Sequence, residues 1–390
     1  MTLKVASRGL VPPFIVMDVM RAANERAAKG EDVLHLEVGQ PGTPAPRRVL
    51  EAAKDALDGD RIGYTDAHGI PPLRDAIARH YREHYGTDLD VRRIFVTTGS
   101  SGGFLLAFLS CFDAGDRVGL AAPGYPAYRN ILSALGIEPV LLPTDLEHRF
   151  QPTPELVEAV DGPLHGLIVA SPSNPTGTML GRAELQQLVE VCRAREIRLI
   201  SDEIYHGISY GERAVSALEL CDDAVVINSF SKYYSMTGWR LGWMVLPEEL
   251  LRPIECLGQN FFISPPTLSQ LAGAVALDCR EDLDAYVAAY ARNRALLLDE
   301  LPKAGFDRMA PADGAFYLYA DVTRLTNDSD EFCRRMLAET GVATTPGIDF
   351  DPERGNRFIR FSFAGPEAEI AEAAKRLIRW QGSGIRDQNL

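Results

Sequence analysis

Residues 225–242 of this 390-residue chain read VVINSFSKYYSMTGWRLG and combine a buried strand with a group of polar side chains. The run from Val225 to Ile227 is short, apolar and β-branched, which is typical of a strand inside a parallel sheet. Hydroxyl-bearing residues follow, with Lys232 among them and Arg240 eight positions later. Because open α/β sheets bind ligands beyond the carboxyl ends of their strands, the sequence predicts that Lys232 lies at a ligand site.

The chemistry of this group favours a phosphorylated aldehyde cofactor. Partial desolvation lowers the pKa of a lysine and makes its amine a candidate for Schiff-base formation. Ser229, Ser231 and Arg240 supply the hydroxyl donors and the planar cation that bind a phosphate monoester. An amine beside a phosphate site indicates pyridoxal phosphate, whereas a lone lysine is more often a solvated surface charge.

The length and composition predict a globular protein of two domains. Hydrophobic residues make up 46% of the chain and charged residues 24%, which is ordinary for a folded protein. The 54 acidic and 40 basic residues give a formal charge of −14. That charge argues against nucleic acid or an anionic membrane as a partner.

Six cysteines are scattered along the chain without a Cys-x-x-Cys motif or a neighbouring histidine cluster. This distribution favours neither a disulfide framework nor a metal site, so we expect a reducing compartment and no bound metal. The N-terminal residues lack the pattern of a signal peptide, and the apolar run 104–109 is too short to span a bilayer. We therefore expect a cytoplasmic protein.

Strand-like and helical segments alternate through the first three quarters of the chain. Strands are expected at 93–98, 117–122, 166–170, 197–201 and 225–227, and helices at 47–57, 73–85, from 104 onward and at 184–195. This alternation predicts an α/β fold with a mostly parallel, doubly wound sheet. From about residue 288 a long helix and short mixed elements follow. We therefore predict a large domain at 46–289 and a smaller α+β domain formed by both termini, 1–45 plus 290–390.

A glycine-rich segment, Gly99-Ser-Ser-Gly-Gly, separates the expected strand 93–98 from the helix that follows it. Backbone amides and the positive end of a helix dipole converge on an anion in such an arrangement, so the segment favours a bound phosphate. The segment matches neither Gly-x-Gly-x-x-Gly nor a Walker motif, so a dinucleotide or nucleoside triphosphate is disfavoured.

Other polar side chains follow the remaining strands, and each has a structural alternative. Asp202 could pair with a pyridinium nitrogen or cap the next helix. Tyr125 could stack on a flat cofactor or belong to the core, and Tyr64 could reach outward from a glycine-flanked loop or pack within it. Asn174 lies between two prolines. Arg360 lies in an alternating strand and could bind a substrate carboxylate or form a cross-strand salt bridge.

Taken together, these motifs resemble the class I/II aminotransferases, pyridoxal-phosphate enzymes of the aspartate-aminotransferase fold (fold type I). The resemblance extends over nearly the whole chain, from residue 39 to residue 360. It depends on the joint order and spacing of SPSNPTG (171–177), SDEIY (201–205), SFSK (229–232), GWRLG (238–242) and RFS (360–362).

The resemblance implies a role for each residue around the cofactor ring. Lys232 would form the Schiff base and then carry a proton between the substrate Cα and the cofactor. Asp202 would hold the pyridine nitrogen, and Tyr205 and Asn174 would hold the ring hydroxyl. Tyr125 would stack on the ring.

The resemblance also implies partners for the phosphate and for the substrate. Arg360 and Asn174 would hold the α-carboxylate beside the backbone of Gly39. Tyr64 would reach the phosphate of the neighbouring subunit, which implies a homodimer with shared active sites. Within one subunit the phosphate would bind Ser100, Ser101 and Arg240, together with Ser229, Ser231 or both.

Two departures from the family pattern bear on the substrate of an enzyme of amino acid metabolism. Many relatives have Gly-Glu-Pro-Asp-Phe where this chain has Gly39-Gln-Pro-Gly-Thr, and some aspartate-specific relatives have a lysine at the position of Ser101. We therefore expect transfer from a neutral L-amino acid to 2-oxoglutarate or pyruvate, by a ping-pong reaction through a pyridoxamine form. The apolar segment 12–20, with Phe14 and Ile15, is the candidate substrate-side wall; packing between the domains is the alternative.

Three other functions remain open at this point. A pyridoxal-phosphate-dependent C–S β-lyase would use the same lysine, aspartate and arginine. Aspartate aminotransferase activity could occur without a basic residue at Ser101. An effector-sensing half of a transcription regulator would need a basic DNA-binding module, and the strong acidity of this chain makes that function the least expected of the three.

Overall fold

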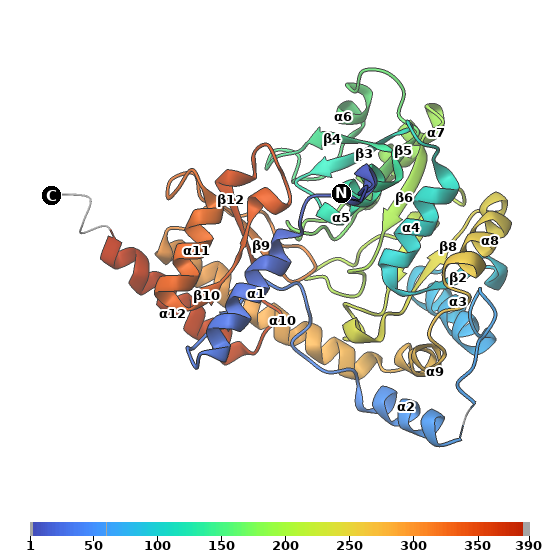
Figure 1. The fold of residues 1–390 in the computed structure, drawn as a ribbon, viewed down its shortest axis with the longest axis horizontal. Helices are drawn as coiled ribbons and strands as arrows, with labels where there is room; N and C mark the ends of the chain where they lie inside the picture. The colour runs from blue at the N-terminus through green and yellow to red at the C-terminus, as the bar shows by residue number, and fades with distance from the viewer. Residues whose placement is uncertain (1–2, 60, 385–390) are drawn as a thin grey trace.

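The computed structural model describes residues 3–59 and 61–384, and a seven-stranded sheet lies at its centre (Figure 1). The strand order is β2-β8-β7-β6-β5-β3-β4. Strand β8 runs antiparallel to β2 and β7, and the other neighbouring pairs are parallel, which confirms the predicted mostly parallel sheet. The strands are β2 (Ile94–Thr97), β3 (Arg117–Ala122), β4 (Glu138–Pro143), β5 (Gly166–Ala170), β6 (Arg198–Asp202), β7 (Val225–Ser229) and β8 (Gly242–Val245).

Two hydrophobic clusters cover the two faces of this sheet, because successive side chains of each buried strand point to opposite sides. Val226 belongs to one cluster, whereas Val225 and Ile227 belong to the other. The first face packs against α2 (Arg47–Gly59), α3 (Pro71–Tyr85), α6 (Pro154–Glu158), α7 (Arg182–Ala194) and α9 (Thr267–Ala276). The second packs against α4 (Gly99–Cys111), α5 (Pro126–Leu135) and α8 (Leu251–Phe261).

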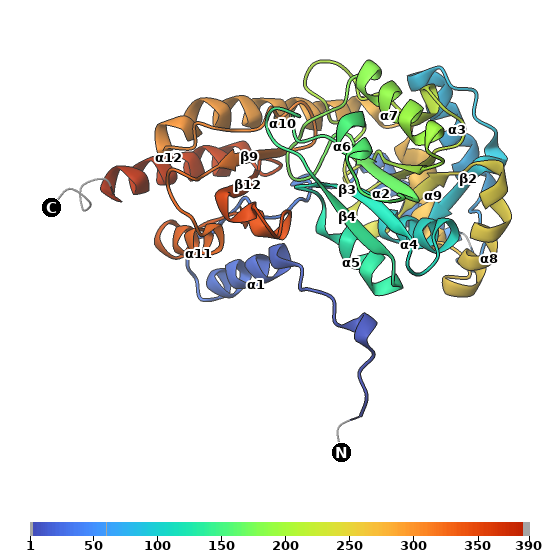
Figure 2. The ribbon, with the colours of Figure 1, turned by 90° about the horizontal axis from the view of Figure 1, so that it is seen from above.

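A smaller group of elements is built from both ends of the chain and has its own hydrophobic cluster. Figures 1 and 2 show α1 on the same side of the molecule as α11 and α12, away from the large sheet. The group contains a three-stranded antiparallel sheet, β11-β12-β9, and a parallel pair, β1-β10. Its elements are α1 (Ile15–Ala28), β1 (Leu34–His35), β9 (Tyr317–Asp321), α11 (Ser329–Thr340), β10 (Val342–Ala343), β11 (Thr345–Pro346), β12 (Phe358–Ser362) and α12 (Glu367–Gly384).

The long helix α10 (Arg280–Glu300) connects the two groups and begins eight residues before the predicted start of a long helix near 288. The predicted domain boundary between 289 and 290 therefore falls inside a continuous helix, and the two-domain division stays a prediction. Within residues 3–59 and 61–384, no helix is long and apolar enough to cross a membrane.

Helix α4 also begins earlier than predicted, at Gly99 instead of Phe104. Its first turns contain several glycines, because neighbouring side chains leave little room for a Cβ at these positions. A Cβ on Gly99, which has a φ of +67°, would lie 2.5 Å from Nη2 of Arg240. A Cβ on Gly103 would lie 3.3 Å from side-chain atoms of Ile227 and Met244.

Candidate active site

A cleft of about 980 Å³, its solvent-open part included, lies where the carboxyl ends of the parallel strands face the smaller group of elements. Eleven of the thirteen residues predicted for the site line it, whereas Ser229 and Tyr64 do not. The eleven are Gly39, Ser100, Ser101, Tyr125, Asn174, Asp202, Tyr205, Ser231, Lys232, Arg240 and Arg360.

Lys232 follows the end of β7 by three residues and projects into this cleft. Its Nζ donates a hydrogen bond to the carbonyl oxygen of Gly39 and lies 5.6 Å from the ring centroid of Tyr205. Burial, followed by the nearby guanidinium groups of Arg360 and Arg240, lowers the pKa of Lys232 to about 8. An amine with this pKa is partly unprotonated near neutral pH and can act as a nucleophile or a base.

Asp202 is the last residue of β6 and is buried beneath the cleft. One carboxylate oxygen accepts a hydrogen bond from the Tyr128 hydroxyl, and the other accepts one from the backbone N–H of Ile204 at 3.0 Å. Burial raises the pKa of Asp202 to about 6. A buried carboxylate of this kind is stabilised by a cationic partner, which a protonated pyridine nitrogen would provide.

The residues predicted for a phosphate gather at the start of α4 and after β7. Ser100, Ser101, Ser231 and Arg240 line the cleft, next to the position where only glycine fits at residue 99. Ser229 lies below them, because its hydroxyl is buried 2.9 Å from the hydroxyl oxygen of Ser231 and accepts the Ser231 backbone N–H at 3.0 Å. The hydroxyls, the helix N-terminus and the exposed guanidinium together fit a phosphate monoester.

Arg360 is buried at the opposite end of the cleft, in β12. Its guanidinium donates to Asn174 Oδ1 at 2.8 Å and to the carbonyl oxygen of Glu37, and it lies 4.4 Å above the ring of Tyr317. Among the described residues no carboxylate pairs with Arg360, and its buried Nε has no hydrogen-bond partner. The cross-strand salt bridge considered from sequence is therefore not formed, and the guanidinium can bind a ligand carboxylate.

Two tyrosines close the base of the cleft. The hydroxyl groups of Tyr205 and Tyr317 lie 2.6 Å apart. A Cβ at position 39 would lie 1.9 Å from the Tyr317 hydroxyl oxygen, which explains the glycine there. Tyr317 and Tyr128 were not predicted as site residues, and no motif in their surroundings distinguishes them from core tyrosines.

The apolar side of the cleft comes from the start of α1. Phe14, Val16 and Met17 line it, whereas the predicted Ile15 does not. The ring of Phe14 packs edge-on against Tyr125, with centroids 5.8 Å apart and an interplanar angle of 82°. Tyr64 is 83% exposed and lies outside the cleft of its own chain.

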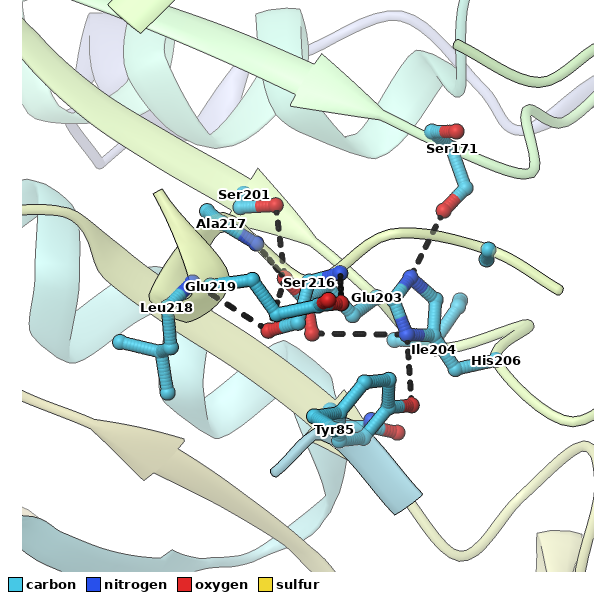
Figure 3. A network of polar contacts seen from close by, with 12 residues as sticks. Tyr85, Ser171, Ser201, Glu203, Ile204, His206, Ser216, Ala217, Leu218 and Glu219 are labelled. Atoms are coloured by element: carbon cyan, nitrogen blue, oxygen red, sulfur yellow. Dashed lines mark hydrogen bonds and ion pairs between the residues drawn. The ribbon is translucent and has the colours of Figure 1, made fainter. Parts of the chain in front are cut away.

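A buried polar network adjoins Asp202 without lining the cleft (Figure 3). Oε1 of Glu203 accepts hydrogen bonds from the Ser201 and Ser216 hydroxyls and from the backbone N–H of Ala217, at 3.1, 3.0 and 2.9 Å. In the described part of the chain no donor reaches its Oε2, which lies 3.5 Å from Nδ1 of His206.

His206 joins this network to the loop that carries Asn174. Its Nε2 donates to the carbonyl oxygen of Ser171 at 3.0 Å, so Nδ1 accepts the Tyr85 hydroxyl at 2.9 Å. Burial raises the pKa of Glu203 to about 8 and lowers that of His206 to about 4. Both side chains are therefore uncharged near neutral pH. Among the described residues no group of histidine, cysteine and carboxylate side chains could hold a metal ion.

Comparison with known proteins agrees with this geometry. Residues 31–377 match the family model "Aminotransferase class I and II". The chain is 53% identical to the valine–pyruvate aminotransferase of Mycobacterium tuberculosis, over 97% of this chain and 99% of that protein. It is 34% identical to the (5-formylfuran-3-yl)methyl phosphate transaminase of Methanocaldococcus jannaschii, over 93% of this chain and 95% of that protein.

The fold agrees as well. The crystal structure of an aminotransferase from Mycobacterium tuberculosis superposes with a TM-score of 0.96 at 52% identity, covering 98% of this chain and all of that one. The two curated relatives have different substrates in their names, so these similarities establish the type of reaction and leave the substrate open. With its seven-stranded sheet and its lysine-bearing cleft, this chain belongs to the class I and II aminotransferases, the family of transaminases that use pyridoxal phosphate.

Proposed function

We propose that the protein is a pyridoxal-phosphate-dependent aminotransferase that moves the amino group of a neutral, apolar L-amino acid to a monocarboxylic 2-oxo acid such as pyruvate. Membership of the family supports the reaction. The distribution of charge in the cleft supports the substrate class.

The number of cationic side chains in the cleft is the main support for a monocarboxylic substrate. Among the described lining residues, the cationic side chains are Lys232, Arg240 and Arg360. We assign them to the cofactor aldehyde, the cofactor phosphate and the substrate α-carboxylate, in that order. A second carboxylate, as in aspartate or 2-oxoglutarate, would be desolvated without a cation, and this costs free energy. Gln40 and Ser101, which also line the cleft, are uncharged.

The apolar wall supports the same substrate class. An aliphatic substrate side chain, branched or unbranched, would be shielded from water by packing against apolar lining residues. These are Phe14, Val16, Met17 and Val38. The M. tuberculosis relative is named for valine and pyruvate, a neutral branched donor and a monocarboxylic acceptor.

The residues that would hold the cofactor are those at the strand ends. Asp202 would pair with the ring nitrogen, Tyr125 would cover a ring face, and Tyr205 and Asn174 would lie near the ring hydroxyl. When bound, pyridoxal phosphate supplies an electron-withdrawing ring that stabilises negative charge at the substrate Cα. The phosphate would bind Ser100, Ser101, Ser231 and Arg240.

Lys232 and Arg360 would then orient and deprotonate the substrate. Arg360, held by Asn174 and by the Glu37 carbonyl, would fix the α-carboxylate and so direct the Cα–H bond. Lys232, with its pKa lowered to about 8, can take a proton from Cα and return one as the reaction proceeds.

We also propose a homodimer in which Tyr64 contributes to the neighbouring cleft. Tyr64 is exposed next to Ile62, and α2 exposes Leu50 and Leu57 nearby in sequence. Exposed apolar groups of this kind are typical of subunit interfaces. Sedimentation at several protein concentrations tests this: a monomer at all concentrations would contradict it. The cytoplasmic location stays a prediction.

A half-reaction screen tests the substrate. Each of the twenty amino acids is mixed with the loaded enzyme, and the loss of the cofactor absorbance and the keto acid formed are measured. We expect valine, alanine and other neutral donors to react at least about 10-fold faster than aspartate or glutamate at equal concentration. A preference for the dicarboxylic donors, or for 2-oxoglutarate over pyruvate as acceptor, would contradict the proposal. Pyruvate and ammonia released from an S-substituted cysteine would indicate a β-lyase.

A further inference from the structure

Helix α1, which carries the apolar wall of the cleft, receives its N-terminal cap from the other end of the chain. The residue at the N-cap position, Phe14, has no side chain able to accept a hydrogen bond. The backbone N–H groups of Ile15 and Val16 instead donate to Oδ1 and Oδ2 of Asp349, each at 3.2 Å. One carboxylate thus satisfies two of the unpaired amides at the start of the helix.

Asp349 is itself held firmly. It ends the 3-10 turn η7 (Gly347–Asp349), its side chain is buried, and the whole residue is 1% exposed. Its carbonyl oxygen accepts a hydrogen bond from Arg129 of α5 at 2.6 Å. The turn follows β11, in which Thr345 is the register partner of Arg360 in β12. The residue that caps α1 therefore lies directly after the strand pair that contains the proposed carboxylate-binding arginine.

The residues held by this cap are those that would contact a substrate side chain. Val16, whose N–H is capped, lines the cleft together with its neighbours Phe14 and Met17. Met17 is 48% exposed, so packing against the protein fixes it only in part. The bond between Asp349 and the helix is therefore one of the contacts that position this wall relative to Arg360.

We propose that Asp349 is a specificity-determining positioning residue, which holds the wall of α1 at the distance from Arg360 that suits a branched apolar side chain. The proposal depends on the neutral-donor function proposed above. Asp349 acts through α1 and does not touch the substrate. Its loss should therefore weaken binding of donors that reach the wall and leave small donors largely unaffected.

The test compares valine with alanine as donors for the wild-type enzyme and for Asp349→Ala. Alanine presents one methyl group, whereas the valine side chain has two more carbons to place against the wall. We expect the ratio of kcat/KM for valine to that for alanine to fall about 10-fold, through a higher KM for valine. The kcat with alanine should stay within about twofold of the wild-type value.

Three further variants separate positioning from general damage. Asp349→Asn retains one acceptor oxygen and should give an intermediate ratio. Met17→Ala removes part of the wall and should lower the ratio with the cap intact. Glu25→Gln changes an exposed charge on α1 and should leave the ratio unchanged. An equal loss for valine and alanine in Asp349→Ala, or an unchanged ratio, would overturn the proposal.

A binding measurement separates this proposal from the proposed function. Calorimetry gives the dissociation constants of 3-methylbutanoate and propionate, a branched and a small monocarboxylate, without turnover. Asp349→Ala should lose about 10-fold in the preference for the branched acid, even if the wild-type enzyme transaminates neither donor. Wild-type enzyme inactive with both donors would overturn the proposed function only. An unchanged preference between the two acids would overturn the role of Asp349.

Discussion

Replacing Glu203 with glutamine should stabilise the protein at alkaline pH. The carboxyl group of Glu203 is buried and its Oε1 accepts three hydrogen bonds, whereas no residue that the structure describes donates to its Oε2. Glutamine keeps the acceptor oxygen and places an N–H₂ group where the protonated acid would have its hydroxyl. It therefore reproduces the uncharged form of the side chain at every pH.

The size of the effect follows from the pKa of Glu203, which burial raises from 4.5 to about 8. Between these values the folded protein holds a proton that the unfolded chain has lost, so the free energy of unfolding of the wild type falls as the pH rises. At about 1.4 kcal/mol for each pH unit, the full loss is about 5 kcal/mol above pH 8. Between pH 5 and pH 9 the variant should gain about 3 to 4 kcal/mol relative to the wild type.

Urea unfolding followed by circular dichroism at pH 5, 6, 7, 8 and 9 measures this difference. Protein concentration is kept equal, since the stability of an oligomer depends on it. Glu212→Gln, an exposed change in the following loop, is the matched control and should follow the wild type. Parallel pH profiles for Glu203→Gln and the wild type, or a variant that is less stable at pH 9, would show that Glu203 is not held in its protonated form.

Three more predictions concern the cleft. Arg360→Lys loses the planar guanidinium that can bind a carboxylate at two points. In steady-state assays kcat/KM should therefore fall about 30- to 100-fold, mainly through a higher KM. A change below threefold would contradict the role assigned to Arg360. Gly99→Ala places a methyl group against Arg240 and should weaken pyridoxal-phosphate binding about 10-fold, as measured by fluorescence titration. Gly59→Ala is the control and should leave this binding unchanged, because no described atom lies within 4 Å of its Cβ. The rate at which the apoprotein reacts with pyridoxal phosphate should rise with pH through about 8, because the neutral amine of Lys232 is the nucleophile; stopped-flow absorbance showing a midpoint near 10.5 would contradict this.

The sequence was informative where a functional residue follows a buried strand. Asp202 and Lys232 are found this way, since the end of an apolar run marks the edge of the sheet where ligands bind. Arg360 could be placed on a strand, but its hydrogen bonds to Asn174 and Glu37 could not be predicted from the strand pattern, because those residues lie 186 and 323 positions away.

Other features depend on the tertiary structure and leave no local pattern. Tyr128 of α5 donates a hydrogen bond to Asp202, which lies 74 positions later in the chain. The residues around Tyr128 do not distinguish it from a tyrosine of the core. The cap of α1 joins residues 334 positions apart. Ser229 was grouped with Ser231, although Ser229 is still the last residue of β7 and is buried below the cleft.

Every role proposed for the cleft requires that Lys232 hold the aldehyde of pyridoxal phosphate. Borohydride reduction of the loaded protein, followed by proteolysis and mass spectrometry, identifies the lysine that carries the cofactor. We expect a pyridoxyl-phosphate group on the peptide that contains Lys232, and none on a Lys232→Ala protein treated in the same way. A label on another lysine, or no label in a wild-type protein saturated with the cofactor, would contradict it.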